Sequence, residues 1–289
     1  MSGKIVAIVG PTAAGKTALA LELAQQFPGE IVCADSRTIY RDMDIGTAKP
    51  TPAEQKAIRH HLLDIADPGE LLSAAAFKQL ATAAIEDIWS RGLVAYVVGG
   101  SGLYIDALLF NYQFPAAADP QERARLEAMT TGELQELLAA SDPEAFDQID
   151  LANRRRLIRA IETAGQPRSR AFELRRDTLL LGLSMNKEVA QVRITKRIKK
   201  MLDEGFLSEV QRIGEKYGWD SSSLEVIGYK AFKDVAGGTK DLSAAIAEFV
   251  RGDMALYKKQ VTWFKRNPYI EWLDDPAAAR PLVAAFLAT

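Results

Sequence analysis

The segment from Gly10 to Thr17 constrains this chain most, because it matches the phosphate-binding pattern G-x-x-x-x-G-K-[ST]. The apolar run Ile5–Val9 precedes it and predicts a buried parallel strand. Residues 18–24, which follow it, are strong helix formers. A glycine-rich loop between a strand and a helix start is the context in which this pattern binds phosphate. A glycine turn that merely joins strand to helix is the competing interpretation.

The chemistry of such a loop is specific. Backbone N–H groups of the loop and of the helix N-terminus point at one spot, where helix polarity adds about half a positive charge. Lys16 supplies a full positive charge, and the Thr17 hydroxyl is a natural ligand for a phosphate-bound Mg²⁺. We therefore expect a di- or triphosphate site built from Gly10, Pro11, Thr12, Ala13, Ala14, Gly15, Lys16 and Thr17.

Composition is typical of a cytoplasmic enzyme. The chain has 289 residues, of which 48% are hydrophobic, enough for one large core and a small appended domain. No apolar run approaches the roughly 18 residues of a membrane span, and no signal-peptide pattern opens the chain. A single cysteine, Cys33, excludes an internal disulfide. The adjacent His60 and His61 do not face one way on a helix or strand, so we expect no metal ligation there.

The net charge of −2 conceals a clustering of basic residues. Concentrated basic surface on a slightly acidic chain indicates a phosphate-rich partner, with solvated helix faces as the alternative. The first cluster holds Arg154, Arg155, Arg156, Arg159, Arg168, Arg170, Arg175 and Arg176; the second holds Arg193, Lys196, Arg197, Lys199 and Lys200; the third holds Lys258, Lys259, Lys265 and Arg266.

Buried strands alternate with helices along most of the chain, which predicts an α/β fold, a P-loop NTPase-like parallel sheet flanked by helices. In such sheets ligands bind beyond the carboxyl ends of the strands. Asp35, Asp64 and Gly99–Ser101 fall at predicted strand ends, on the side of the P-loop. Besides the first strand, we expect strands at 31–34, 61–65, 94–98, 179–182 and 269–273 and helices at 53–59, 73–90, 151–164 and 188–204.

A break at 114–120 interrupts this alternation, and helical pieces without strand candidates follow at 120–129 and 131–139. We expect a small all-helical insertion at 115–150 that acts as a lid. Residues 1–114 and 151–289 would then form the P-loop core with its C-terminal helices.

Asp35 is the candidate for acid–base chemistry. It follows a predicted strand and precedes the polar side chains of Ser36, Arg37 and Thr38, which favours a substrate over a metal as its partner. An aspartate at a strand end beside a phosphate site suits a general base if its reach fits the acceptor. A helix N-cap without chemistry is the simpler interpretation.

Eight segments together resemble the tRNA dimethylallyltransferase family, also called tRNA isopentenyltransferases. The resemblance spans roughly residues 4–275 in the expected order, and the block Asp44–Pro50 is highly specific to this family. Ala14 and Ser101 replace the family's usual Ser and Thr, and the insertion is short. The eight segments are 10–17, 34–40, 43–50, 60–68, 98–104, 155–160, 227–230 and 259–265.

The resemblance implies that the P-loop holds the diphosphate of dimethylallyl diphosphate instead of ATP, with Mg²⁺ neutralising the leaving group. The acceptor would be the exocyclic amine of the adenosine 3′ to the anticodon in tRNA. Asp35 would take or hold its proton, and Arg193 would help Lys16 and Thr17 stabilise the diphosphate. The implied tRNA contacts of this monomer are Asp35, Ser36, Arg37, Thr38, Ser101, Arg123, Arg155, Arg156, Leu157, Ile158 and Arg159, with the helical insertion.

Three other functions stay open. A P-loop small-molecule kinase would use the same loop for ATP and Asp35 to activate a hydroxyl, and it predicts ATP turnover. A non-catalytic RNA-binding protein with a relic phosphate site predicts tRNA binding that does not depend on Asp35. Within the family, an adenine-nucleotide isopentenyltransferase would prenylate free nucleotides, which the arginine helix argues against.

Overall fold

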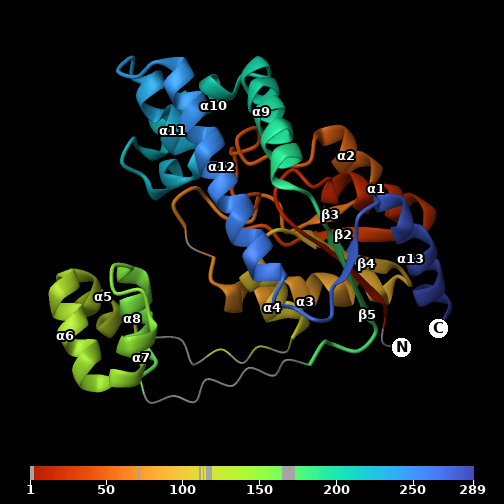
Figure 1. Ribbon diagram of the computed structural model, residues 1–289, viewed down its shortest axis with the longest axis horizontal. Coiled ribbons are helices and arrows are strands. Elements are labelled where there is room, and N and C mark those ends of the chain that lie inside the picture. Colours follow the sequence, from red (N-terminus) through yellow and green to blue (C-terminus); the bar gives the residue numbers. More distant parts are fainter. Residues whose placement is uncertain (1–2, 71, 111, 113, 115–118, 165–172) are drawn as a thin grey trace. The chain divides into compact units, whose positions relative to one another are not determined.

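The computed structural model describes residues 3–70, 72–110, 112, 114, 119–164 and 173–289. The chain divides into two compact units, one formed by Met1–Asn111 with Phe172–Thr289 and the other by Tyr112–Ala171 (Figure 1). Each unit has its own apolar core.

The larger unit is built on a six-stranded sheet with the order β3-β2-β4-β1-β5-β6. Every pairing is parallel; Ile5 of β1, for example, pairs with Ala95 on one side and Thr178 on the other. The predicted α/β parallel sheet is therefore confirmed. The strands are β1 (Ile5–Val9), β2 (Gly29–Cys33), β3 (His60–His61), β4 (Val94–Gly99), β5 (Thr178–Leu183) and β6 (Glu271–Leu273).

Strand β3 is shorter than the predicted strand at 61–65. Leu62 and Asp64 have φ angles of 65° and 55°, in the left-handed region, so the backbone cannot continue the ladder past His61. The chain turns there instead, and the turn carries Asp64 towards Lys49.

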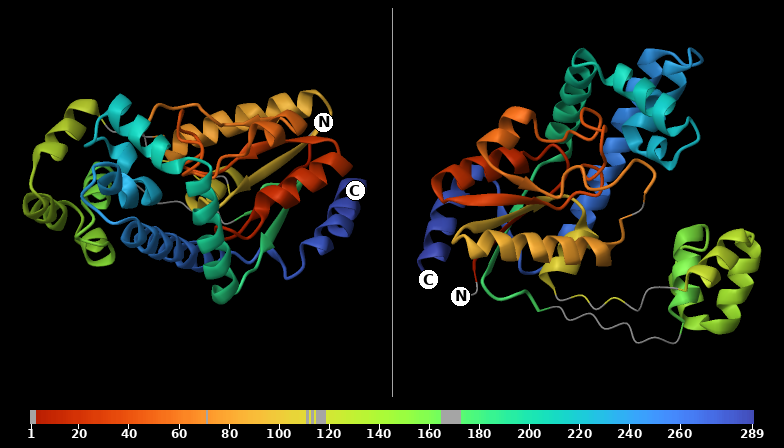
Figure 2. Two further views of the ribbon diagram at one scale, coloured as in Figure 1. Left: turned by 90° about the horizontal axis from the view of Figure 1, so that it is seen from above. Right: turned by 180° about the vertical axis from the view of Figure 1, so that it is seen from behind.

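Helices cover both faces of the sheet, as the all-apolar strands require. Alternate residues of β1 point to opposite faces: Ile5 packs with Phe77 of α3, whereas Val6 packs with Leu23 of α1. Figure 2 shows the strands between α3 on one side and α1 with α13 on the other. The helices around the sheet are α1 (Lys16–Gln26), α2 (Pro52–Ala57), α3 (Ala74–Ser90), α4 (Gly102–Leu109) and α13 (Ala279–Ala288), with a 3₁₀ turn at Pro276–Ala278.

A third apolar cluster lies among the helices between β5 and β6. Ile194, Ile198 and Met201 recur on one face of α9 at helical spacing and pack with Phe206 and Tyr229. Figure 1 shows the long helix α12 running from this cluster past the sheet. These helices are α9 (Lys187–Asp203), α10 (Phe206–Tyr217), α11 (Ile227–Ala236) and α12 (Leu242–Phe264), with a 3₁₀ turn at Ser222–Glu225.

The smaller unit is helical, as predicted, but it begins and ends elsewhere. The boundary expected at residue 150 differs from that in the structure, because Leu157 and Ile158 of α8 pack with Leu126, Leu134 and Leu138. Amphipathic α8 cannot bury this face without α5 and α6, so it folds with them. The helices are α5 (Pro120–Ala128), α6 (Thr131–Ser141), α7 (Pro143–Gln148) and α8 (Arg154–Glu162).

No helix in the described ranges is long and apolar enough to cross a membrane.

A buried carboxylate fixes the loop at 43–49. Glu209 of α10 is 1% exposed and accepts hydrogen bonds from the backbone N–H groups of Asp44, Ile45 and Gly46 at 2.9–3.0 Å. The Tyr229 hydroxyl donates a further bond to it at 2.5 Å. A buried charge is tolerated only when it is fully hydrogen-bonded, and four donors meet that condition here.

Glu209→Gln should lower the free energy of unfolding by about 2–4 kcal/mol, because the amide of the new side chain turns a donor towards the backbone N–H groups. Urea unfolding followed by circular dichroism measures the loss. Glu215→Gln, an exposed site on the same helix, is the matched control and should change stability by less than about 0.5 kcal/mol. Equal stability of the two variants would contradict the anchoring role.

Candidate functional site

The P-loop turns sharply between β1 and α1. Gly10 has a φ of 140°, and a Cβ there would lie 2.7 Å from the carbonyl oxygen of Leu183, so no other residue fits. Gly15 caps α1 with a φ of 95°. The two glycines have separate roles: Gly10 allows close approach to β5, and Gly15 turns the chain into the helix whose N-terminus would face a bound phosphate.

Lys16 lies within the loop, and its Nζ donates to the carbonyl oxygen of Pro11 at 2.7 Å. Burial lowers the pKa of Lys16 to about 8; the Asp35 carboxylate opposes this shift and the Arg197 guanidinium adds to it. The lysine is therefore a charged group with incomplete solvation, which an incoming diphosphate would compensate.

Thr17 is the residue that suits a metal ion. Its side chain is partly exposed at the first turn of α1, and nothing in the described part of the chain hydrogen-bonds its hydroxyl. Mg²⁺ commonly takes one or two protein oxygens and completes its shell with phosphate oxygens and water. The hydroxyl of Thr17 fits that requirement. The magnesium site predicted there stays a prediction.

The Asp35 segment meets the loop after β4 at the carboxyl edge of the sheet. The Ser36 N–H donates to Ser101 Oγ at 2.9 Å, and the Ser101 N–H donates to the carbonyl oxygen of Ala34. A Cβ on Gly99 would lie 1.9 Å from that same oxygen, so the two loops touch only because this residue is glycine. Ser101 thus holds the backbone of the Asp35 segment through two hydrogen bonds, one to its side chain and one from its own N–H.

Asp35 keeps one carboxylate oxygen available. Its Oδ1 accepts from the Arg37 N–H at 2.8 Å, which fixes the side chain in a local turn. Its negative charge raises the pKa of Lys16, so the two groups lie close enough to interact electrostatically. Thr38 beside them is buried, and its hydroxyl finds no partner in the described residues. The sequence prediction that Asp35, the P-loop and Ser101 meet at one edge is confirmed.

Residues far along the chain brace the loop, and for two of them, Asp253 and Gln260, the sequence predicted no role. Gln260 Oε1 accepts from the Thr12 N–H at 2.8 Å, while its Nε2 donates to the carbonyl oxygen of Gly100 at 3.0 Å. Arg197 donates to Thr12 Oγ1 at 2.9 Å and to Asp253 Oδ2 at 2.5 Å. The signal for Asp253 and Gln260 was polar residues on the buried face of an otherwise apolar helix. Arg193, a predicted diphosphate contact, lies beside the loop and donates to the carbonyl oxygen of Ala13 at 3.3 Å.

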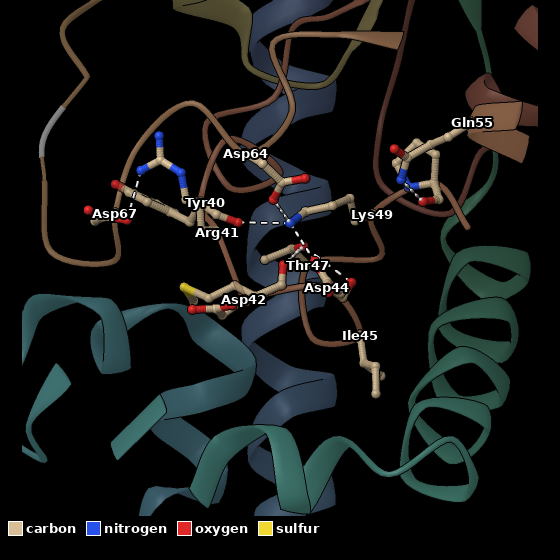
Figure 3. Close-up of polar contacts among 12 residues, drawn as sticks. Tyr40, Arg41, Asp42, Asp44, Ile45, Thr47, Lys49, Gln55, Asp64 and Asp67 are labelled. Carbon is tan, nitrogen blue, oxygen red and sulfur yellow. Dashed lines mark hydrogen bonds and ion pairs between the residues drawn. The ribbon is translucent and has the colours of Figure 1, made fainter. Parts of the chain in front are cut away.

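Asp64, the other aspartate after a predicted strand, is committed to an ion pair. The buried ammonium of Lys49 donates to the carboxylates of Asp44 and Asp64 and to the carbonyl oxygen of Tyr40, at 2.5–2.8 Å (Figure 3). Lys49 therefore joins the turn after β2, its own loop and the turn after β3. This explains why the Asp44–Pro50 block carries charged residues where a core would favour apolar ones.

A cavity of about 380 Å³ adjoins the P-loop on the β5 side. Asp35 and Ser101 follow β2 and β4, which lie on the opposite side of β1 in the sheet. The cavity and the Asp35 segment therefore flank the loop from two directions. The cavity is lined by Ala14, Leu183, Ser184, Met185, Asn186, Val189, Arg193, Leu273, Asp274 and Pro276.

The arginines of the helical unit divide into two groups. Arg123 and Arg159 bind the buried carboxylate of Glu162, and Arg154 donates to the carbonyl oxygen of Glu127. The side chains of Arg155 and Arg156 are exposed and make no hydrogen bond or ion pair with the described residues. These two are the cations most available to a phosphate-rich partner.

Leu157 and Ile158, also predicted to contact tRNA, belong to the apolar core of this unit. Their contact with RNA is still only a prediction. Arg168 and Arg170 lie outside the described residues.

Among the described residues, one group of side chains could hold a metal ion, and it lies away from the P-loop: Glu30, His61 and Asp87. Arg91 already occupies it, bonding both Glu30 and Asp87. Hydrogen bonds from Arg91 lower the pKa of Glu30 to about 2, as expected of a closed ion-pair network.

The family model and the relatives that match this chain belong to one family of prenyltransferases. The model of the IPP transferase family matches residues 38–267. A tRNA dimethylallyltransferase of Roseiflexus sp. (strain RS-1) is 43% identical over 290 residues, covering 96% of this chain and 94% of its own. That of Bifidobacterium longum (strain NCC 2705) is 41% identical over 289 residues, covering 95% and 87%.

Solved structures agree. A full-length tRNA isopentenylpyrophosphate transferase from Bacillus halodurans superposes with a TM-score of 0.74 and 35% identity, covering 99% of this chain and 97% of the other. A eukaryotic dimethylallyltransferase acting on tRNA superposes with a TM-score of 0.85 and 26% identity, covering 99% and 80%.

The pKa of Lys16 predicts how diphosphate binding depends on pH. The Lys16 side chain is a charged ammonium below about pH 8 and a neutral amine above it. Affinity for inorganic diphosphate should therefore be highest below that pH and fall as the pH rises through it. Isothermal titration calorimetry with Mg²⁺ should show up to a tenfold loss per pH unit. Lys16→Arg keeps its charge throughout and should lose this dependence, whereas Lys16→Ala should weaken binding by about 2–4 kcal/mol at every pH below 8. A wild-type affinity that is flat from pH 7 to 10 would contradict the assignment.

Proposed function

This chain belongs to the IPP transferase family, and on that premise we propose that it transfers a dimethylallyl group from dimethylallyl diphosphate to the exocyclic amine of the adenosine 3′ to the anticodon in tRNA. The observation that carries the proposal is the meeting of a phosphate cradle and a carboxylate with a free oxygen at one edge of the sheet. The cradle suits the leaving group, and the carboxylate suits the attacking amine.

The proposed reaction is a substitution at the allylic C1 of the donor. The bond from C1 to the diphosphate oxygen breaks and the diphosphate leaves with the electron pair, while the adenosine N6 forms the new bond to C1. Lys16, Arg193 and the N–H groups at the start of α1 stabilise the charge that develops on the diphosphate. Mg²⁺ held through Thr17 would supply further neutralisation of that charge.

Asp35 serves the other partner. Its free carboxylate oxygen accepts the proton that N6 loses, or holds that N–H as the bond forms. An adenine stacked in an anticodon loop cannot reach this edge of the sheet, so the base must be flipped out of its stack. Ser36, Thr38 and Ser101 surround the position where it would be received.

Exposed Arg155 and Arg156 support tRNA over a free adenine nucleotide as the acceptor, because a single nucleotide offers no row of backbone phosphates for a second set of cations to bind. A mixed assay decides between them. The protein is incubated with dimethylallyl diphosphate, Mg²⁺, unmodified tRNA and AMP, and the nucleosides are weighed by mass spectrometry. The proposal requires one C5 prenyl unit on a tRNA adenosine and none on AMP.

The cavity on the β5 side is the one observation that favours a small-molecule kinase, since it could hold a nucleoside whose phosphates reach the P-loop. That function requires phosphoryl transfer from ATP and yields no prenyl product. Measuring ADP release beside prenyl transfer separates the two reactions.

Asp35→Asn should lower the single-turnover rate of prenyl transfer by about 10²–10⁴-fold. Asparagine keeps Oδ1, which accepts from the Arg37 N–H, so the local turn and the melting temperature should be preserved. Donor affinity should change little, because the P-loop builds that site. Asp203→Asn, an exposed substitution at the end of α9, is the control. A wild-type rate in folded Asp35→Asn protein would exclude Asp35 as the proton acceptor.

Salt dependence tests the tRNA contacts. The Arg155→Ala/Arg156→Ala variant should reduce the slope of log affinity against log salt by about 1.4–1.8, since each phosphate contact contributes about 0.7–0.9. Arg159→Ala should lower it less, because Glu162 already binds that guanidinium. Arg212→Ala on α10 controls for net charge. An unchanged slope would mean that Arg155 and Arg156 are only a solvated face.

A further inference from the structure

Arg197 carries its charge into the interior beside the P-loop. Its Nη2 donates to Asp253 Oδ2 at 2.5 Å, and Asp253 is only 5% exposed. Arg197 itself is partly buried, with 26% of its side chain exposed, and an ion pair with one buried member costs desolvation energy that its mutual attraction offsets only in part. Apolar residues could join α9 to α12 more simply, as Ile194 and Ile198 do elsewhere in the same cluster. The need to join α9 to α12 therefore does not by itself explain the ion pair between Arg197 and Asp253.

Its second contact gives that role. Arg197 Nη1 donates to Thr12 Oγ1 at 2.9 Å, so the threonine oxygen acts as the acceptor in this bond. A hydroxyl that accepts one hydrogen bond still has its own hydrogen to donate. The guanidinium cannot take that hydrogen, because arginine has no acceptor. The Thr12 hydrogen must therefore point to another group.

The backbone of Thr12 cannot bind the anion in its place. Its N–H donates to Gln260 Oε1 at 2.8 Å, and Gln260 is itself held by the carbonyl oxygen of Gly100. Thr12 thus differs from a usual P-loop position, whose amide is free for phosphate. The side-chain hydroxyl is the donor that this residue has left.

We propose that Arg197, held by the Asp253 carboxylate, is a positioning residue that orients the Thr12 hydroxyl as a hydrogen-bond donor to the diphosphate leaving group. The inference rests on the proposed function of the P-loop. Arg197 also brings positive charge close to Lys16, whose pKa that charge lowers. Its buried Nε–H, unpaired within the described residues, adds to the excess of donors at this end of the loop. An excess of buried donors is what an anion site needs and what a purely structural pair avoids.

A double-mutant cycle tests the coupling. Thr12→Val and Arg197→Gln should each lower kcat of prenyl transfer about 10- to 100-fold, with a smaller effect on KM, because the contact strengthens as charge develops. The double variant should lie within about threefold of the slower single variant, since both changes remove one interaction. Lys187→Gln, an exposed charge removal at the start of the same helix, should leave kcat unchanged. If the loss of kcat in the double variant equals the product of the two single losses, the proposal is wrong.

Two further measurements keep the result interpretable. Arg197→Gln alone leaves Asp253 unpaired, so Arg197→Gln/Asp253→Asn is made beside it; the proposal requires a restored melting temperature without restored kcat. Thr12→Ser leaves the ion pair untouched and should keep kcat within about threefold of wild type, whereas Thr12→Val should not. Recovery of kcat in the Arg197→Gln/Asp253→Asn variant would mean that the Arg197–Asp253 ion pair has a structural role only. Equal kcat in Thr12→Ser and Thr12→Val would mean the same.

Binding of inorganic diphosphate with Mg²⁺ separates this proposal from the proposed function. Thr12→Val and Arg197→Gln should each weaken diphosphate binding about tenfold in calorimetry, whether or not prenyl transfer occurs. Wild-type protein that binds diphosphate but forms no prenylated tRNA would refute the function and leave the coupling testable. Unaltered diphosphate affinity in both variants would refute the coupling.

Discussion

The bond between the Thr12 N–H and Gln260 joins residues 248 positions apart, and the site depends on it. A P-loop is a short turn with few contacts of its own, so its shape is set by what packs behind it. Here one face of α12 does this work: Asp253 acts through Arg197, Tyr257 donates to the carbonyl oxygen of Met185, and Gln260 bridges two loops. These side chains recur at helical spacing and turn an ordinary core helix into a polar brace.

A second set of buried charges fixes the other half of the site. Lys49 joins three turns through two carboxylates and a carbonyl, and Glu209 of α10 holds the same loop through three backbone N–H groups. Loops after parallel strands have no ladder to define them, so they need such point contacts. The specificity of the Asp44–Pro50 block thus has a physical basis: the buried Lys49 ammonium needs the carboxylate of Asp44 within the block and that of Asp64 outside it.

The predictions succeeded where periodicity or a rigid motif decided the outcome. The P-loop flanks, the parallel sheet and the adjacency of Asp35 to Ser101 followed from buried strands whose carboxyl ends share one edge. They failed where a local pattern competed with packing. The strand expected at 61–65 stops at His61 because Leu62 and Asp64 take left-handed backbone angles, and α8 joins the insertion because Leu157 has its partners there. The division of the arginines between internal ion pairs and free cations was likewise invisible in their spacing.

The sequence by itself determined the strand–loop–helix unit of the P-loop, because eight consecutive residues between a strand and a helix supply its glycines, its lysine and its threonine. It also determined the family, through blocks whose order and spacing are specific. Only the tertiary structure decided which polar residues serve the cradle. Arg197, Asp253 and Gln260 lie in helical segments whose sequence resembles any amphipathic helix, and their contacts arise from the crossing of α9 and α12 behind the loop. Side-chain partners at that separation depend on helix packing, and a hydrophobic period specifies which face is buried without specifying what it meets.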